Sequence, residues 1–181
     1  HLPKWIGVNP ETGLGEFYID PELDSRDAMI DGQLVKDGNV TNYYSKAGET
    51  LVGKAVPDWM GGLTNTFTYK NFDLSFMISF QTGAKMFDYT GYFLRYSDGV
   101  RVGSFNMEQE VAGNYWKKPG DVVEHPKPIY GNPYRSDKFS SRTLVSTDNV
   151  RMREITFGYR VPISKKYISN LRLFFKANNP F

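Results

Sequence analysis

The sequence contains no cysteine and only two histidines among its 181 residues. Without cysteine there is no disulfide framework, no thiolate metal site and no thiol nucleophile. The histidines, His1 and His125, lie far apart in the sequence and have no neighbouring residues typical of a metal site or an acid–base pair. We therefore expect both to be ordinary surface residues, and we expect no metal and no cofactor.

Long apolar runs and an excess of one charge are also missing. No run approaches the ~18 apolar residues that suggest a transmembrane helix. The net charge is only +2, from 22 Lys and Arg against 20 Asp and Glu, and the basic residues are scattered, which argues against a nucleic-acid partner. Aromatic residues, in contrast, are abundant at 15% although the mean hydropathy is −0.48. This combination is typical of strands with one apolar face, joined by polar loops.

The clearest pattern is a β-hairpin at residues 62–82. From Phe72 to Gln81 apolar and largely polar residues alternate with a period of two, which predicts a strand with one apolar face. The preceding run up to Tyr69 alternates in the same way, and only Lys70 and Asn71 remain for a tight turn. Pro57 and the paired glycines at 61 and 62 predict a bend before the first strand.

A second hairpin is predicted at residues 150–178. Its first strand has Ile155, Phe157 and Tyr159 on one parity, with Arg151 and Arg153 on that same parity at its start. Pro162 ends this strand, residues 163–170 form a short connection, and alternation resumes from Leu171.

Residues 1–61 are predicted to be rich in loops, and residues 83–149 are predicted to form one long loop. Loops of this length are usually functional or disordered. Rings interleaved with cations suit stacking on a sugar or clamping a polar ligand, and the predicted ligand-binding residues are Tyr92, Arg95, Tyr96, Tyr115, Trp116 and Arg135. Alternatively, these rings pack the loop against itself or against another chain. An acidic cluster within residues 20–31 could hold calcium, but it lacks the order of an EF-hand loop, so solvated carboxylates are favoured.

Strand length and loop order leave two all-β folds open: antiparallel up-and-down strands of a transmembrane β-barrel, or a soluble β-sandwich. A ten-residue strand extends about 33 Å, or about 23 Å when tilted by about 45°, close to the ~25 Å apolar band of an outer-membrane barrel. Short turns alternate with long loops, as in such barrels, which favours the barrel with long extracellular loops. The lipid-facing residues would be Phe72, Leu74, Phe76, Ile78, Phe80, Ile155, Phe157, Tyr159, Leu171, Leu173 and Phe175.

Three segments resemble the SusC/RagA family of TonB-dependent outer-membrane transporters of Bacteroidetes. They are VGKAVPDWMGGLTNTFTYKNFDLSFMISFQTGAKMFD (52–88), SSRTLVSTDNVRMREITFGYRVP (140–162) and NLRLFFKANNPF (170–181). The first is similar to the family's G-x-x-x-P-x-x-x-G-G stretch followed by an N-x-F-x-Y-K-x-F-D-L hairpin. The resemblance implies that residues 1–181 are part of the C-terminal region of such a barrel. The plug and most barrel strands would lie outside this segment, whose two ends look cut.

The resemblance also implies a function, import of a glycan fragment, a peptide or another nutrient across the outer membrane of a Gram-negative bacterium. A SusD-like surface lipoprotein would be the partner, TonB would act through parts of the protein outside this segment, and lipid would surround the barrel. No residue matches a catalytic motif, so we do not expect an enzyme. Two other functions stay open: a soluble secreted carbohydrate-binding β domain, and a glycosidase using Glu108 with Glu110, or Asp121 with Glu124.

Overall fold

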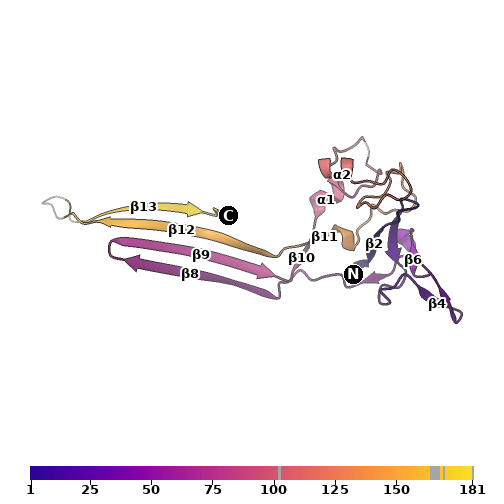
Figure 1. The fold of residues 1–181 in the computed structure, drawn as a ribbon, viewed down its shortest axis with the longest axis horizontal. Coiled ribbons are helices and arrows are strands. Elements are labelled where there is room, and N and C mark those ends of the chain that lie inside the picture. Colours follow the sequence, from indigo (N-terminus) through magenta and orange to yellow (C-terminus); the bar gives the residue numbers. More distant parts are fainter. Residues whose placement is uncertain (102, 164–167, 169, 181) are drawn as a thin grey trace. The chain divides into compact units, whose positions relative to one another are not determined.

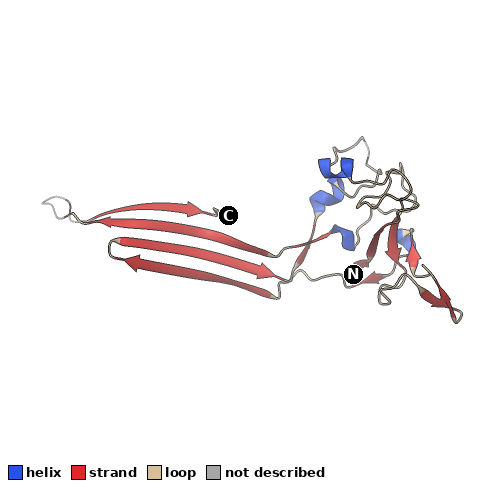
Figure 2. Cartoon of the chain, in the orientation of Figure 1, coloured by secondary structure: helices blue, strands red, loops and turns tan. Residues whose placement is uncertain are grey.

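The computed structural model describes residues 1–101, 103–163, 168 and 170–180, and the chain divides into two compact units. Unit 1 comprises His1–Gly53 and Met86–Val145, and unit 2 comprises Lys54–Lys85 and Ser146–Phe181. Most of the regular structure in both units is antiparallel strand, with a few short helices (Figure 2). The predicted all-β class is therefore confirmed.

Unit 2 is a four-stranded antiparallel sheet in the order β13-β12-β9-β8 (Figure 1). Its strands are β8 (Trp59–Tyr69), β9 (Phe72–Thr82), β12 (Asn149–Val161) and β13 (Leu171–Asn178). Both predicted hairpins are present, and Lys70 takes a positive φ of 54° in the two-residue turn of the first. Most of the predicted connection 163–170 lies outside the described residues.

The first strand begins earlier than the sequence pattern predicts. Gly61 and Gly62 do not form a bend before β8; they lie within it, opposite Phe80 and Ser79 of β9. The ring of Phe80 covers Gly61 so closely that a Cβ there would lie 3.0 Å from ring carbons. A glycine at this position therefore makes room for a ring on the neighbouring strand.

The register gathers the apolar side chains of all four strands on one face. Phe67 pairs with Leu74, Leu74 with Phe157, and Phe157 with Phe175, so one apolar row crosses the whole sheet. Directly paired residues point to the same side of a sheet. The eleven residues predicted to face lipid all share this face, and Phe157 and Phe175 are 47% and 67% exposed.

A β-bulge in β12 corrects the predicted parity of the two arginines. Met152 lies opposite Ile78 while Glu154 lies opposite Met77, so Arg153 is an extra residue in the ladder. The bulge resets the alternation, which places Met152 on the apolar face and Arg151, opposite Ser79, on the polar face. Arg153 also turns to the polar side, because its Nε donates to Ser79 Oγ at 2.9 Å. Without the bulge both guanidinium groups would have shared the apolar face.

Ion pairs between strands mark the polar face; one joins the neighbouring strands β12 and β13, and the other reaches from β13 across β12 to β9. The carboxylate of Glu154 accepts a hydrogen bond from Lys176 at 2.8 Å. The carboxylate of Asp73 accepts hydrogen bonds from both Nε and Nη2 of Arg172. Gly158 is buried beside the latter pair, and a Cβ there would lie 2.5 Å from Asp73 Oδ2. Cross-strand charges of opposite sign stabilise a sheet face, and here they lie on the face without the apolar row.

Unit 1 is assembled from short elements. A three-stranded sheet joins β2 (Trp5–Val8), β3 (Gly15–Tyr18) and β6 (Val40–Thr41). The other elements are β1 (Leu2–Pro3) paired with β7 (Glu49–Thr50), the hairpin β4 (Ala28–Ile30) and β5 (Gln33–Val35), the helices α1 (Tyr89–Leu94) and α2 (Gln109–Gly113), and the 3-10 turns η1 (Tyr44–Lys46) and η2 (Ser141–Thr143). A short pair, β10 (Lys85–Phe87) and β11 (Leu144–Ser146), lies where the chain passes between the units.

Phe17 of β3 is the centre of the apolar packing in unit 1. It is fully buried, and its ring packs edge-on against Trp5 at 5.1 Å and Tyr44 at 5.9 Å. The interval predicted as one long loop thus contains helices, and with the N-terminal segment it forms a single compact unit. In the described part of the chain, no helix is long and apolar enough to cross a membrane.

Candidate functional site

A buried ion pair lies at the centre of the polar groups of unit 1. Arg142, in η2, donates through Nη1 to both carboxylate oxygens of Asp98, at 3.1 and 2.9 Å, and both side chains are almost fully buried. Ser136 Oγ donates to Asp98 Oδ2 at 2.7 Å, and Asn132 Nδ2 donates in turn to Ser136 at 2.8 Å. Because a buried charge is tolerated only when it is paired and hydrogen-bonded, this network fixes the loops that carry it.

Two aromatic rings hold the guanidinium of Arg142 in place. Its Cζ lies 4.7 Å from the ring centroid of Trp5 and 4.6 Å from that of Tyr96. Cation–π contacts of this kind are strongest where water is excluded. Trp5 comes from the N-terminal strand β2, so the arginine joins segments that are distant in the sequence.

His125 is the third group around Arg142, and its position corrects the prediction that it is a surface residue. It is only 3% exposed, and its Nδ1 lies 3.0 Å from Arg142 Nη2. Burial and the adjacent Arg142 lower the pKa of His125 below its ordinary value, against the weaker opposite effect of Asp98 and Glu124. The sequence around His125 carries no recognisable motif, because its partners come from other loops.

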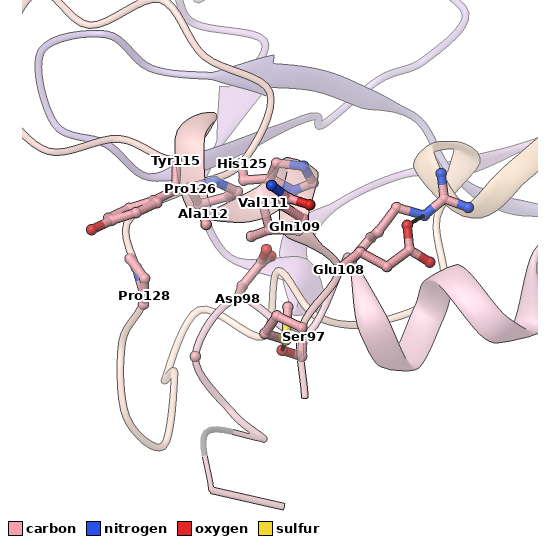
Figure 3. Close-up of a pocket in the computed structure, with 13 residues that line it drawn as sticks. Ser97, Asp98, Glu108, Gln109, Val111, Ala112, Tyr115, His125, Pro126 and Pro128 are labelled. Carbon is pink, nitrogen blue, oxygen red and sulfur yellow. Dashed lines mark hydrogen bonds and ion pairs between the residues drawn. The ribbon is translucent and has the colours of Figure 1, made fainter. Parts of the chain in front are cut away.

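His125 and Asp98 help to line a cavity of about 300 Å³ within unit 1 (Figure 3). Its walls are otherwise largely apolar. The lining residues are Arg95, Ser97, Asp98, Gly99, Met107, Glu108, Gln109, Val111, Ala112, Tyr115, His125, Pro126 and Pro128. A concave, mainly apolar site with a few polar groups is the usual form of a small-ligand pocket, and this volume is at the lower end of the range for such pockets.

Two of the six predicted ligand-binding residues, Arg95 and Tyr115, line this cavity. Arg95 is engaged by carboxylates, with Asp88 as its closest partner and Glu108 and Glu110 at 3.3 and 3.6 Å. Burial lowers the pKa of Arg95, but Tyr96 and these carboxylates together raise it above its ordinary value. The guanidinium is therefore neutralised by protein groups at the cavity wall.

The other four predicted residues do not line the cavity. Tyr92 is buried and accepts a hydrogen bond from Arg101 at 3.0 Å, while Tyr96 stacks on Arg142. Trp116 donates through Nε1 to the carbonyl of Pro10 at 2.7 Å, and Arg135 is exposed, with its Nε 3.6 Å from Asp137. Tyr92, Tyr96 and Trp116 thus pack unit 1 internally, as the alternative interpretation expected. A ligand-binding role for these residues stays a prediction.

The acidic residues of the loops engage protein partners. Asp24 forms an ion pair with Lys4 at 2.8 Å. Glu22 accepts a hydrogen bond from Thr50 Oγ1 at 2.9 Å, and Asp27 accepts one from the backbone N–H of Asp37 at 3.0 Å. Among the described residues, no three His, Cys, Asp or Glu side chains are arranged to hold a metal ion. Glu108 and Glu110, proposed for a glycosidase, both bind Arg95.

No family model matches the sequence. Two curated proteins of Formosa agariphila are similar to this chain. TonB-dependent receptor P3 is 25% identical over 91% of this chain, and TonB-dependent receptor P39 is 26% identical over 73%. The aligned regions make up only 16% and 13% of those receptors, so this chain corresponds to a small part of their length.

Solved structures of the RagAB peptide importer share the fold. In its "closed-closed" state the match has a TM-score of 0.74 at 19% identity and covers 99% of this chain and 19% of the matched chain. The "open-open" state gives a TM-score of 0.70 at 17% identity, over 99% and 18%. The resemblance to TonB-dependent receptors is thereby confirmed, and the relatives are receptors and importers rather than enzymes.

Replacing Asp98 with Asn should strongly destabilise unit 1. The substitution leaves the charge of Arg142 buried between two rings without its counter-ion, which typically costs about 3–5 kcal/mol. Urea unfolding followed by tryptophan fluorescence, to which Trp5 beside Arg142 contributes, measures the change. Asp24→Asn, which breaks the exposed pair with Lys4, is the control and should leave the curve unchanged. Equal effects of the two substitutions would contradict the role of the buried pair.

Acidification should destabilise unit 1 through His125. Because the pKa of His125 is lower in the folded than in the unfolded chain, the unfolded chain takes up the proton first. Stability is therefore fully present above the unfolded pKa near 6.5 and falls as the pH drops from there through the folded pKa. Unfolding at pH 7.5 and pH 5 measures this loss. His125→Asn, whose amide can still accept from Arg142, should lose less stability over that interval; an unchanged loss would rule out His125 as its source.

Proposed function

We propose that this chain, as a relative of TonB-dependent receptors, is a C-terminal portion of an outer-membrane transporter that imports a nutrient. TonB-dependent receptor P3 matches across 91% of the chain, and the up-and-down sheet of unit 2 has the strand order expected of a barrel wall. The localisation that follows is the outer membrane of a Gram-negative bacterium related to Bacteroidetes.

The observation that carries this proposal is the continuous, exposed apolar face of unit 2. Rings and aliphatic side chains from all four strands form it, including Phe67 at 56%, Leu173 at 58% and Phe175 at 67% exposure. An uncovered apolar face of this extent is unfavourable in water but suits contact with lipid. β8 and β9 have 11 residues each, about 36 Å of strand, which is enough to span an apolar band when tilted. If this chain were a soluble carbohydrate-binding domain, the same apolar face would be left exposed to water.

The polar face would then line the lumen, and the connections would set the orientation. The tight turn at Lys70 and Asn71 would lie at the periplasmic end, where barrel turns are short. Residues 86–145 run from the end of β9 to the start of β12, at the end of the sheet opposite this tight turn. They would therefore lie on the extracellular side. Unit 1 would thus be the part of this chain that meets the nutrient.

Substrate and partners are further parts of the proposal. The nutrient is a glycan fragment or a peptide, and a SusD-like lipoprotein at the cell surface is the partner that the family resemblance implies. TonB would supply energy through regions outside this segment. The matched RagAB structures are of a peptide importer, which is compatible with a peptide nutrient. Contacts with it would come from Tyr92, Arg95, Tyr96, Tyr115, Trp116 and Arg135, of which Arg95 and Tyr115 line the cavity.

Replacing Phe76 with Arg should block assembly of the full-length transporter. Phe76 lies midway along β9 on the apolar face, where an arginine near the bilayer midplane costs about 2–4 kcal/mol. Outer-membrane fractionation and heat-modifiable mobility on gels measure folded, inserted protein. Ser75→Arg places the same charge on the adjacent polar face and should assemble far better. Equal assembly of the two variants would contradict lipid contact by this face.

A further inference from the structure

The polar face of unit 2 carries more positive than negative charge. Its four strands contain only two carboxylates, and each has a basic partner; the pairs are Asp73 with Arg172 and Glu154 with Lys176. The remaining basic residues of these strands form no ion pair within the described part of the chain; they are Arg151, Arg153 and Arg160. The face that the proposed function places in the lumen therefore has an excess of cations.

Two of these arginines flank one serine near the end of β9. Arg151 pairs with Ser79 in the register of β12 and β9, and Arg153, the bulge residue, donates through Nε to Ser79 Oγ at 2.9 Å. Neighbouring like charges destabilise a sheet face, and bulges are frequent next to functional sites, where they re-aim a side chain. An anion bound beside Ser79 would relieve the repulsion between the two arginines.

Arg153 also lines a hollow of about 350 Å³ on the polar face. Its other lining residues are Met60, Gly61, Ser79, Phe80, Gln81 and Asn149. In the register, Met60, Gln81 and Asn149 form one row across the sheet, beside Ser79. Arg153 is thus the single charged residue of the lining, and no carboxylate is available there to neutralise it.

The hydrogen bonds of the hollow leave Arg153 as its main free donor. The amide nitrogens of Gln81 and Asn149 donate to the carbonyl of Thr147, at 2.9 and 2.7 Å. Nε of Arg153 is engaged by Ser79, whereas Nη1 and Nη2 have no partner among the residues that the structure describes, and the side chain is exposed. Two adjacent N–H groups of a guanidinium match the two oxygens of a carboxylate.

The size and position of the hollow suit part of a transported molecule. A volume of about 350 Å³ is at the lower end for small-ligand pockets and holds a carboxylate with the group that carries it. Ser79 and Arg153 lie at the end of the sheet away from the tight turn at Lys70. In the proposed orientation this is the extracellular end of the lumen, where a nutrient enters.

We propose that Arg153, with Arg151 beside it, binds a carboxylate of the imported nutrient on the lumen wall. This inference rests on the proposed function, because a nutrient reaches this face only if unit 2 lines a lumen. The nutrient that unit 1 meets outside the membrane would pass this position on its way inward. Acidic peptides and acidic sugars both carry carboxylates, so the experiment compares the two sources.

The test uses the full-length transporter in detergent and calorimetric titration with two matched pairs of probes. One pair is a glycine–glutamate–glycine tripeptide, blocked at both ends, and the same peptide with glutamine; the other is trigalacturonate and its methyl ester. In at least one pair the acid should bind at least tenfold more tightly than its neutral counterpart, and this preference should shrink as salt is added. The pair that shows the preference identifies the source of the carboxylate.

Arg153→Gln removes the charge from the hollow and should weaken binding of the acid at least tenfold, with binding of the neutral probe unchanged. Arg151→Gln should weaken acid binding to a smaller extent, since Arg151 lies beside the hollow without lining it. Arg160→Gln is the matched control. It makes the same change in β12 at the other end of the sheet, opposite Arg172, and should bind all probes like the wild type.

Three results would overturn the inference. They are no preference for the acid in either pair, equal acid binding by the Arg153 and Arg160 variants, and a lower thermal stability of Arg153→Gln with unchanged acid binding. The last result would mean that another part of the transporter supplies the carboxylate. Outer-membrane assembly of the wild type, scored separately, tests the proposed function, so the two failures are distinguishable.

Discussion

The strand pairing of unit 2 is the interaction on which its two faces, and with them the proposed contact with lipid, depend. Backbone hydrogen bonds between the four strands pair the main-chain polar groups that face a neighbouring strand, and the same register sorts the side chains into an apolar and a polar face. A slip of one residue in any pairing would move that strand's apolar side chains to the polar face. The bulge at Arg153 shows how strictly this sorting holds, because a single extra residue keeps two arginines off the apolar face.

Unit 1 is stabilised by a different kind of interaction. Its fully buried apolar centre is small, with Phe17 as the main ring, and buried polar side chains are correspondingly numerous. The pair of Asp98 and Arg142 links the segment after α1 to η2, and Trp5 adds the N-terminal strand. Such a network gives long loops one defined arrangement, provided that its polar groups are satisfied. The Nε2 atom of His125 is one of four buried side-chain atoms that lack a hydrogen-bond partner among the described residues, with Arg95 Nε, Asp137 Oδ1 and Ser140 Oγ.

The hairpins were predictable from the sequence, and the buried network was not, for a physical reason. Period-two alternation is local, so Phe72 to Gln81 reveals its own strand and its own faces. The bulge at Arg153 depends on the partner strand β9, and local parity therefore assigned Arg151 to the wrong face. The partners of His125 are Arg142, 17 residues away, and through it Asp98 and Trp5, which no local pattern brings together. The cavity, formed by several loops, was equally inaccessible, although Arg95 and Tyr115 were singled out by composition.

Site-by-site labelling of β9 tests the central claim, that its two faces meet lipid and water, most directly. This segment has no cysteine, so single cysteines can replace residues 72–79 in turn in the full-length protein, once any cysteines elsewhere are removed. In intact outer membranes, a water-soluble maleimide should label positions 73, 75, 77 and 79, while positions 72, 74, 76 and 78 should resist it and respond to a quencher dissolved in the lipid. Labelling that does not alternate, with both sets equally open to the aqueous reagent, would contradict the account.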